Sequence, residues 1–246
     1  MVARVYYYCA YWASWTLFGA VCMALAAVCT LLLLLPGRER AAPWVREAIR
    51  RLFATWVAWL GAAQLVKVTW SGLGNKLLPR QTLYVANHPG LIDATLLLAR
   101  IPDVICIFKP SLIRNPFLAP AAIMAGYAPG NSGVDLVRGL AKKAAAGCSV
   151  LIFPEGTRTT PGAVLNALKP GFAIIARRAA FPIQLLVIRC DRELLPRGRS
   201  WWTVPRFPIR VDIRVEQTLP AAVNRPVDDT VQTVERAFVG LLARAT

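Results

Sequence analysis

Histidine is almost absent from this sequence of 246 residues, in which His88 is the only one. A metal site built from several histidines is therefore excluded. The six cysteines include no C-x-x-C pair, and three of them lie in an apolar N-terminal run, where a free cysteine behaves as a small hydrophobic residue. The sequence indicates neither a zinc site nor a disulfide framework, and we expect no bound metal or other cofactor.

Acidic residues are also scarce. Only 13 Asp and Glu stand against 29 Lys and Arg, which gives a formal net charge of +16, while 56% of the residues are hydrophobic. A chain that is both basic and apolar is neither disordered nor an ordinary soluble domain. Its length suits one α/β catalytic domain and is short for two, and no internal repeat or low-complexity linker is evident.

The N-terminal segment contains no charged residue between Arg4 and Arg38. Residues 12–35 are apolar and long enough to cross a hydrocarbon core of ~30 Å as a helix, and the run is too long for the core of a cleaved signal peptide. Aromatic side chains precede this run and arginines follow it, as at the two interfaces of a membrane. We predict a transmembrane or membrane-embedded helix in residues 1–40, with the rest on the cytoplasmic side, which is the inner-membrane face in a bacterium.

The next segment, residues 41–71, has a helical spacing of apolar residues from 44 to 70 with arginines between them. Such an amphipathic helix suits the membrane interface. The same periodicity equally fits a helix that packs on the protein's own core.

From residue 72 to residue 246 the pattern predicts one α/β domain with a mostly parallel sheet covered by helices. Four apolar runs read as buried strands: 82–86, 104–108, 150–153 and 183–189. Residues 209–216 alternate apolar and polar side chains, which suits a strand at the sheet edge. Helical spacings occur at 93–99, 134–146, 168–178 and 228–245.

His88 follows the first predicted buried strand, and Asp93 lies five residues later. The carboxyl end of a strand is where open α/β sheets bind ligands. We predict that Pro89 takes the first position of a helix, that His88 is its N-cap, and that Asp93 leans back toward the imidazole. A carboxylate there would hold one ring nitrogen protonated and leave the other as a general base. Most isolated histidines are structural, so this pair is weak support when taken alone.

A second polar motif follows the strand at 150–153. Glu155, Gly156 and Arg158 lie directly after it. A carboxylate, a permissive glycine and a guanidinium at a strand end can receive a polar or anionic substrate group. The alternative is a simple turn carrying a surface ion pair.

Together the two motifs resemble those of the glycerolipid acyltransferases, typified by bacterial 1-acylglycerol-3-phosphate acyltransferase. Asn87 and His88 with Asp93 match the N-H-x-x-x-x-D block of that family, and residues 153–159 (FPEGTRT) match its third block without a mismatch. The region around Lys109 is similar to the connecting region. The resemblance covers about residues 80 to 190 in order and spacing.

The resemblance implies an acyltransferase in which His88 is the general base toward an acceptor hydroxyl and Asp93 orients it. The remaining matched residues would bind the substrate: Asn87, Lys109, Glu155, Gly156, Thr157 and Arg158. The reaction is acyl transfer from a thioester to a lysolipid or related hydroxyl, with acyl-CoA or acyl carrier protein as co-substrate and membrane lipids as partners. It needs an activated nucleophile but no metal.

One block departs from the family pattern. The second block usually has a glycine followed within a few residues by an arginine associated with the acceptor phosphate, whereas residues 126–133 contain no arginine and the nearest is Arg138. Lysophosphatidic acid as the acceptor is therefore in doubt. Another lysolipid, an amino-acid lipid or a specialised lipid remains an alternative, as do a catalytically silent lipid-binding or tethering protein and a thioesterase.

The C-terminal part of the domain is rich in arginine and tryptophan, a combination suited to anionic headgroups. We expect membrane lipids here and no nucleic acid. The residues are Arg189, Arg192, Arg197, Arg199, Arg206, Arg210 and Arg214, with Trp201 and Trp202.

Overall fold

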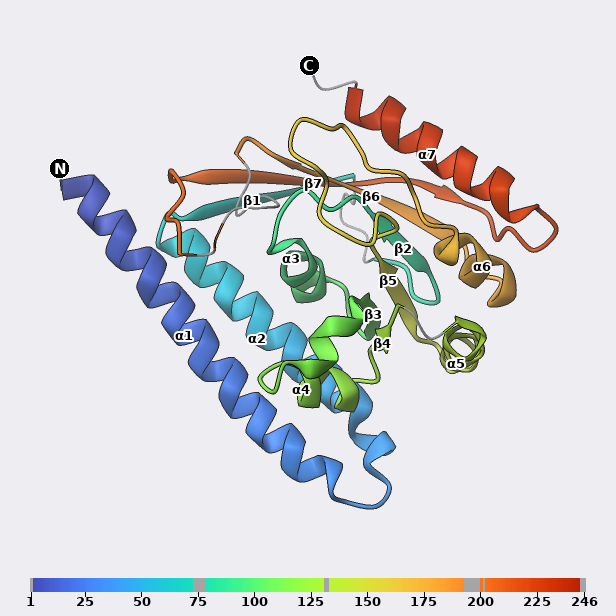
Figure 1. Cartoon of the computed structure of the whole chain (residues 1–246), viewed down its shortest axis with the longest axis horizontal. Coiled ribbons are helices and arrows are strands. Elements are labelled where there is room, and N and C mark those ends of the chain that lie inside the picture. The colour runs from blue at the N-terminus through green and yellow to red at the C-terminus, as the bar shows by residue number, and fades with distance from the viewer. Residues whose placement is uncertain (1, 73–77, 131–132, 193–199, 201, 244–246) are drawn as a thin grey trace.

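The computed structural model describes residues 2–72, 78–130, 133–192, 200 and 202–243. In these ranges a seven-stranded sheet forms the centre of the molecule, with helices on both faces (Figure 1). The strands are β1 Val66–Ser71, β2 Leu83–Ala86, β3 Val104–Phe108, β4 Ala128–Pro129, β5 Ser149–Ile152, β6 Ile183–Cys190 and β7 Ile209–Leu219.

The sheet has the order β1-β7-β6-β2-β5-β3-β4 and is mostly parallel. The strands from β6 to β4 run parallel to one another, whereas β7 pairs antiparallel with β6 and parallel with β1. The carboxyl ends of β2, β5, β3 and β4 therefore lie along one side of the sheet, which we call the carboxyl edge, as distinct from an edge strand. Their apolar side chains on both faces explain why they need helices above and below.

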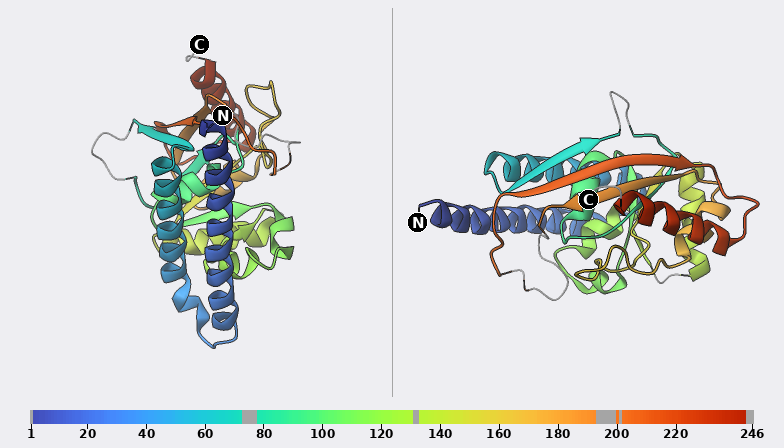
Figure 2. Two further views of the ribbon diagram at one scale, coloured as in Figure 1. Left: turned by 90° about the vertical axis from the view of Figure 1, so that its left-hand side faces the viewer. Right: turned by 90° about the horizontal axis from the view of Figure 1, so that it is seen from above.

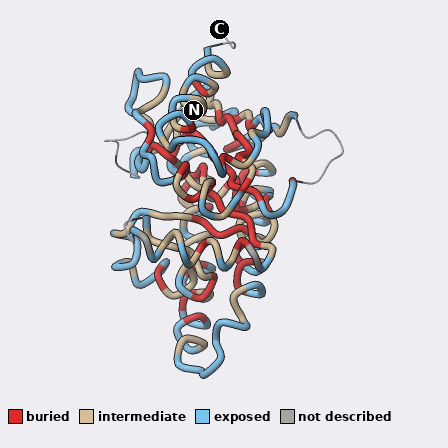
Figure 3. Tube along the Cα trace, turned by 90° about the vertical axis from the view of Figure 1, so that its right-hand side faces the viewer, coloured by how far each residue is buried: buried red, intermediate tan, exposed pale blue. Residues whose placement is uncertain are grey.

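The helices divide between the two faces (Figure 2). Side chains of α2 and α3 pack on one face, and those of α5, α6 and α7 on the other. The helical elements are α1 Val2–Leu33, η1 Arg38–Ala41, α2 Ala42–Ala62, α3 Asp93–Arg100, η2 Pro110–Arg114, α4 Ala119–Met124, α5 Gly133–Ala145, α6 Gly171–Arg178 and α7 Val227–Ala243. Buried residues follow the sheet, while the turn between α1 and α2 is exposed (Figure 3). The predicted mostly parallel α/β fold with an N-terminal apolar helix is confirmed.

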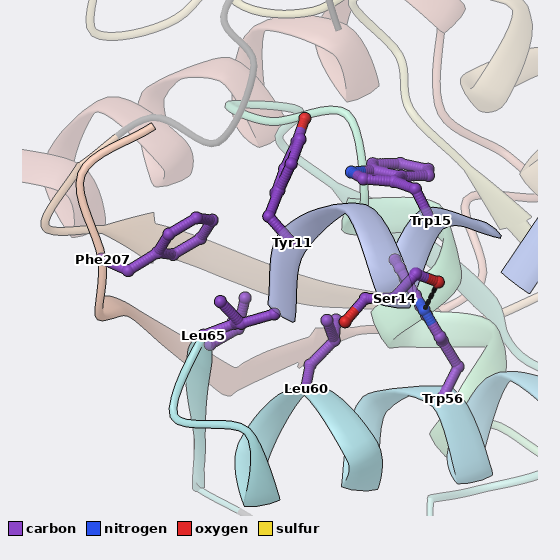
Figure 4. A pocket seen from close by; sticks show the side chains of 8 residues that line it. Tyr11, Ser14, Trp15, Trp56, Leu60, Leu65 and Phe207 are labelled. Atoms are coloured by element: carbon purple, nitrogen blue, oxygen red, sulfur yellow. Dashed lines mark hydrogen bonds between the residues drawn. The ribbon is translucent and has the colours of Figure 1, made fainter. Parts of the chain in front are cut away.

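The long helix α1 runs beside α2 (Figures 1 and 2). Among the described residues it is the one helix long and apolar enough to cross a membrane, and 11% of its most apolar window is buried. Its N-terminal half packs through aromatic side chains, because the ring of Phe18 lies 4.2 Å from that of Trp56, centroid to centroid. Trp56 also donates its indole N–H to the backbone oxygen of Ser14 at 3.3 Å (Figure 4).

Both ends of α1 contact the domain. Near its start, the Tyr6 hydroxyl donates to the carbonyl oxygen of Ala63 at 3.1 Å, and the ring of Tyr7 lies 5.9 Å from that of Phe207. Near its end, Cys29 is buried in a small core that also contains Met124 of α4. The helix therefore lies along the domain rather than projecting from it.

The predicted helix through residue 70 is wrong in its second part. Helix α2 ends at Ala62, Gln64 takes a left-handed φ of 55°, and β1 begins at Val66. Apolar residues at 66 and 70 fit one face of a helix, but those at 66, 68 and 70 also fit one face of a strand. The segment forms a strand because it pairs with β7. Of the two environments considered for the helix, the structure shows packing on the protein's own core, where Ile49 and Leu60 are buried.

The predicted edge position of residues 209–216 is also wrong. Strand β7 lies between β1 and β6, so β1 is the edge strand. Ile209, Val211 and Ile213 are buried while Arg210 and Arg214 are exposed. The alternation of apolar and polar side chains along β7 thus indicates that one face of the sheet is open to solvent there. It does not indicate whether the strand has a neighbour on each side.

Candidate active site

The two sequence motifs meet at one edge of the sheet because β2 and β5 are adjacent and parallel. Val85 of β2 is in register with Ile152 of β5. The residues that follow each strand, His88 and Glu155, therefore emerge side by side. The backbone N–H of His88 donates to the Glu155 carboxylate at 2.9 Å, which joins the two motifs directly.

His88 and Asp93 form the hydrogen-bonded pair that their spacing predicts. Nδ1 of His88 lies 2.8 Å from Oδ2 of Asp93. The predicted helix start is wrong, however, because α3 begins at Asp93 and neither Pro89 nor His88 belongs to it. Residues 88–92 instead form a turn, in which the backbone N–H of Gly90 donates to the same Oδ2 at 2.7 Å. The turn lets the Asp93 carboxylate reach back to the imidazole across five residues.

The surroundings of the pair leave one side of the imidazole enclosed and the other accessible. The Asp93 side chain is 1% exposed and that of His88 19% exposed, so the carboxylate is enclosed while the imidazole reaches the surface. Burial raises the pKa of the Asp93 carboxyl, and the hydrogen bonds from His88 and Gly90 act in the opposite direction. No described residue forms a hydrogen bond with Nε2 of His88. That nitrogen therefore remains available to a substrate.

Phe153 contacts the His88 ring, and Asn87 anchors the chain directly before it. The ring of Phe153 stacks on the imidazole with centroids 4.3 Å apart and an angle of 27° between the planes. The Asn87 side chain joins β2 to β6, since its amide donates to the oxygen of Ile188 at 2.9 Å and accepts from the N–H of Ile188 at 2.7 Å. Asn87, predicted to bind substrate, is thus buried and bonded to backbone.

Glu155 is likewise enclosed, with 3% of its surface exposed. Its carboxylate accepts from the N–H of His88, from the Thr159 hydroxyl at 2.9 Å on each oxygen, and from the N–H of Asn166 at 2.9 Å. All of these contacts are internal. The prediction that this carboxylate binds the acceptor has no direct contact to support it, and its geometry is that of a group that holds two loops together.

The other predicted binding residues lie at the surface of the same edge. Gly156 has a φ of 67°, a left-handed conformation that favours glycine, whereas the end of the flexible Lys169 side chain, 2.7 Å from the position of a Cβ atom, could shift to make room. Thr157 is exposed and Arg158 half-buried. Lys109 follows β3, and its exposed side chain forms no hydrogen bond or ion pair with a described residue.

Sequence reasoning missed three contributors to this arrangement. Phe153 and Thr159 are part of the matched third block, and their roles follow from the contacts with His88 and Glu155. Asn166 also caps the loop, because its side-chain amide donates to the oxygen of Arg158 at 3.1 Å. Nothing in the sequence around Asn166 predicts that role.

Parts of two predicted features lie outside the described residues. These are Asn131 and Ser132 of the second block, and Arg197, Arg199 and Trp201 of the basic segment. Of the rest, Arg138 is exposed on α5, and Arg214 pairs with Asp212 at 2.7 Å on the open face of β7. Within the described part of the chain, no group of three or more His, Cys, Asp or Glu side chains is arranged to hold a metal ion.

An α/β sheet with an N-H-x-x-x-x-D turn and an F-P-E-G-T-R turn on adjacent strands fits the glycerolipid acyltransferases that the sequence motifs resemble. The Acyltransferase family profile matches residues 67–189 of the chain. The chain belongs to this family, which confirms the resemblance seen in its motifs.

Individual relatives agree with this assignment. The chain is 28% identical to the chloroplastic 1-acyl-sn-glycerol-3-phosphate acyltransferase BAT2 of Brassica napus over 192 residues, which are 72% of this chain and 55% of that protein. It is 30% identical to the 1-acyl-sn-glycerol-3-phosphate acyltransferase of Cocos nucifera over 125 residues, 47% of this chain and 39% of the relative. The chain thus spans about half the length, or less, of these curated relatives.

The fold also matches a solved structure. The 1-acyl-sn-glycerophosphate acyltransferase PlsC of Thermotoga maritima aligns with a TM-score of 0.73 at 20% sequence identity, covering 100% of this chain and 98% of that one. The likeness therefore includes the N-terminal helices as well as the sheet.

Proposed function

We propose that the protein is a membrane-associated O-acyltransferase that moves a fatty acyl group from a thioester to the hydroxyl of a lysolipid or a related acceptor. The observation that carries the proposal is the contact between Nδ1 of His88 and Oδ2 of Asp93 at 2.8 Å, with Nε2 unengaged by the described residues. Family membership supports the reaction class. The relatives' names favour a glycerophospholipid acceptor, whereas the absence of an arginine from the second block weakens the case for an acceptor phosphate.

The proposed reaction begins when Nε2 of His88 removes the proton of the acceptor hydroxyl. The oxygen attacks the thioester carbonyl, and the tetrahedral intermediate then collapses with cleavage of the C–S bond. The departing thiolate takes the proton from the imidazolium, so the products are an ester and a free thiol. Asp93 keeps Nδ1 protonated and stabilises the imidazolium between the two proton transfers.

Glu155 acts in this proposal as a positioning residue. It accepts the N–H of His88 and that of Asn166, and so fixes the turn that carries the base relative to the turn after β5. The acceptor is then bound by groups on the exposed side of the same edge, among which we place Thr157, Arg158 and Lys109. Acyl-CoA or acyl carrier protein is the co-substrate.

The proposed membrane association rests on α1. The helix has 32 residues and is therefore about 48 Å long. Because its start contacts Phe207 and its end contacts Met124, it cannot cross a bilayer while the domain stays on one side. We therefore propose that α1 is embedded beside the domain, on the cytoplasmic face that the arginines after the helix predict.

The full chain, purified in detergent, tests the reaction when it is given labelled acyl-CoA or acyl carrier protein together with a panel of lysolipids. The panel includes 1-acylglycerol-3-phosphate and uncharged acceptors. We expect labelled ester with at least one acceptor and none from His88→Ala, while Val239→Ser on α7 keeps full activity. Circular dichroism verifies that both variants are folded.

Three outcomes contradict the proposal. Ester formation by a folded His88→Ala variant would remove the general base. Free fatty acid without acylated lipid would indicate a thioesterase. Lipid binding without transfer for every donor and acceptor, unchanged in Asp93→Asn, would indicate a catalytically silent lipid-binding protein.

A further inference from the structure

A group of apolar side chains on η2, on α4 and between them is exposed. They are between 38% and 53% accessible, although none of them has a catalytic role. We call the group the η2–α4 surface, and it consists of Leu112, Ile113, Phe117, Leu118 and Ile123. Apolar side chains scattered singly are normal on a protein surface, whereas five within twelve consecutive residues mark a site of interaction.

The exposure is fixed by the local fold. The side-chain oxygen of Asn115 accepts the N–H of Phe117 at 2.9 Å, and its backbone oxygen accepts the N–H of Ala119 at 2.9 Å. The inner side of α4 is already occupied, since Ala119 and Met124 are buried. The η2–α4 surface therefore cannot turn inward without breaking this packing.

The η2–α4 surface adjoins the apolar surface of α1. Helix α4 packs against the C-terminal half of α1 in the small core around Cys29 and Met124. On α1 itself, Val28 and Leu31 are exposed. Exposed apolar side chains therefore lie both on the η2–α4 surface and on the half of α1 that packs against α4, and α1 is a helix of membrane-spanning composition.

Basic side chains border this region. Lys109 directly precedes η2 and Arg114 is its last residue; both are exposed, and no acidic residue lies between them. The exposed Arg38 and Arg40 lie on η1, which contacts α4, together with one acidic residue, Glu39. An apolar centre with a cationic border matches a leaflet that contains anionic headgroups.

The η2–α4 surface is also close to the candidate active site in the topology. Strand β3 neighbours β5, and both end at the edge that carries His88 and Glu155. The segment from Lys109 onward leaves the sheet at that same edge. Leu91, in the turn between His88 and Asp93, is itself 41% exposed.

We infer that the η2–α4 surface inserts into the headgroup region of an anionic phospholipid leaflet and holds the His88 edge of the sheet against it. The occupant is the lipid surface itself. A lysolipid acceptor would then reach the imidazole from the leaflet without entering water. This last step rests on the proposed function, whereas the insertion does not.

A fluorophore at defined positions tests the insertion. Cys9 is the one exposed cysteine in the described chain, so Cys9→Ser gives a parent for single labelling, and the parent alone measures residual labelling of the other cysteines. NBD is attached at Phe117→Cys or, as an independent position, at Ile113→Cys. The matched control is Val239→Cys, an exposed aliphatic position on α7 at the opposite face of the sheet. The full chain is reconstituted into vesicles containing phosphatidylglycerol.

We expect blue-shifted NBD emission at positions 113 and 117 that doxyl-labelled lipids quench, and water-like emission at position 239 that iodide quenches. The result should not change when the protein is diluted in lipid. Equal, iodide-sensitive emission at all three positions overturns the inference. Emission that turns water-like on dilution also overturns it, because a second copy of the chain would then be the occupant. An inactive protein with inserted labels would overturn the proposed function and leave the inference standing.

Discussion

Replacing Asp93 by asparagine separates the charge of this residue from its shape. In the wild type, both Nδ1 of His88 and the N–H of Gly90 donate to the same oxygen, Oδ2 of Asp93. An asparagine must place its carbonyl oxygen at that position, because an NH2 group there would face the N–H of Gly90. The imidazole therefore keeps Nδ1 protonated in Asp93→Asn, and the variant loses only the negative charge that stabilises the imidazolium.

The magnitude follows from the strength of one charge-assisted hydrogen bond. Such a bond contributes about 1.5–3 kcal/mol, so kcat/KM should fall roughly 10- to 150-fold in Asp93→Asn. Asp93→Ala removes the acceptor altogether, leaves the N–H of Gly90 unpaired and frees the imidazole to adopt the other tautomer. Its loss should approach the order of 10⁴-fold seen when a catalytic carboxylate no longer orients its histidine.

The assay is acyl transfer to the best acceptor, measured as kcat/KM for wild type and both variants between pH 5 and pH 9 as rough limits. Equal losses in the two variants would refute the reasoning, because the asparagine would then not preserve the tautomer. Unchanged activity in Asp93→Asn would remove the carboxylate from the mechanism.

The same variant has an opposite expected effect on stability. Burial raises the pKa of the Asp93 carboxyl, so folding favours its protonated form. The contribution of Asp93 to stability is therefore present at low pH and is lost as the pH rises through the raised pKa. Asp93→Asn should melt above the wild type at neutral pH and match it in acid, and a difference that is the same at every pH would contradict this sign.

Three further variants test the parts that support the site. In Glu155→Gln an NH2 group replaces one of the two carboxylate oxygens, so the backbone N–H of either His88 or Asn166 faces a donor and loses its hydrogen bond. This variant should lose about 1–3 kcal/mol of stability and most of its activity, measured by melting and by acyl transfer. Gly156→Ala should lower stability by about 1–2 kcal/mol because of its φ of 67°, read from the melting temperature. Arg46→Ala removes a buried guanidinium that lies 2.6 Å from the partly exposed carboxylate of Asp103. It should lower stability by about 1–3 kcal/mol, measured by melting, while the protein that remains folded stays active, and an unchanged melting temperature would contradict it.

The sequence predicts the central strands well because their constraint is local. The runs that became β2, β3, β5 and β6 are apolar on both faces, and only a strand covered on two sides needs such a composition. The start of β1 is different. Val66 and Trp70 fit both a helix and a strand, and the choice depends on β7, which follows more than a hundred residues later. No local pattern contains that partner.

The same distinction between local and long-range constraints applies to the residues of the candidate site. The pairing of His88 with Asp93 follows from their proximity in the chain, although the sequence predicts the wrong helix start between them. Glu155 and Asn87 have the residue types of binding groups, but their polar atoms bond to the backbone of distant segments. The residue type alone does not predict whether a polar side chain forms hydrogen bonds inside the protein or faces a ligand. That depends on the assembled fold.

The internal use of Glu155 divides the site into two parts with different constraints. The part that carries the proposed base is held by two buried carboxylates, because Glu155 accepts the backbone N–H of His88 and Asp93 contacts Nδ1 of its ring. The part proposed to bind the acceptor consists of side chains on the exposed side of the same edge, such as Thr157 and Lys109. Changes in the second part do not disturb the hydrogen bonds of the first. We therefore expect that a chain without an arginine in its second block keeps the hydrogen-bonded geometry of His88 while it takes another class of acceptor.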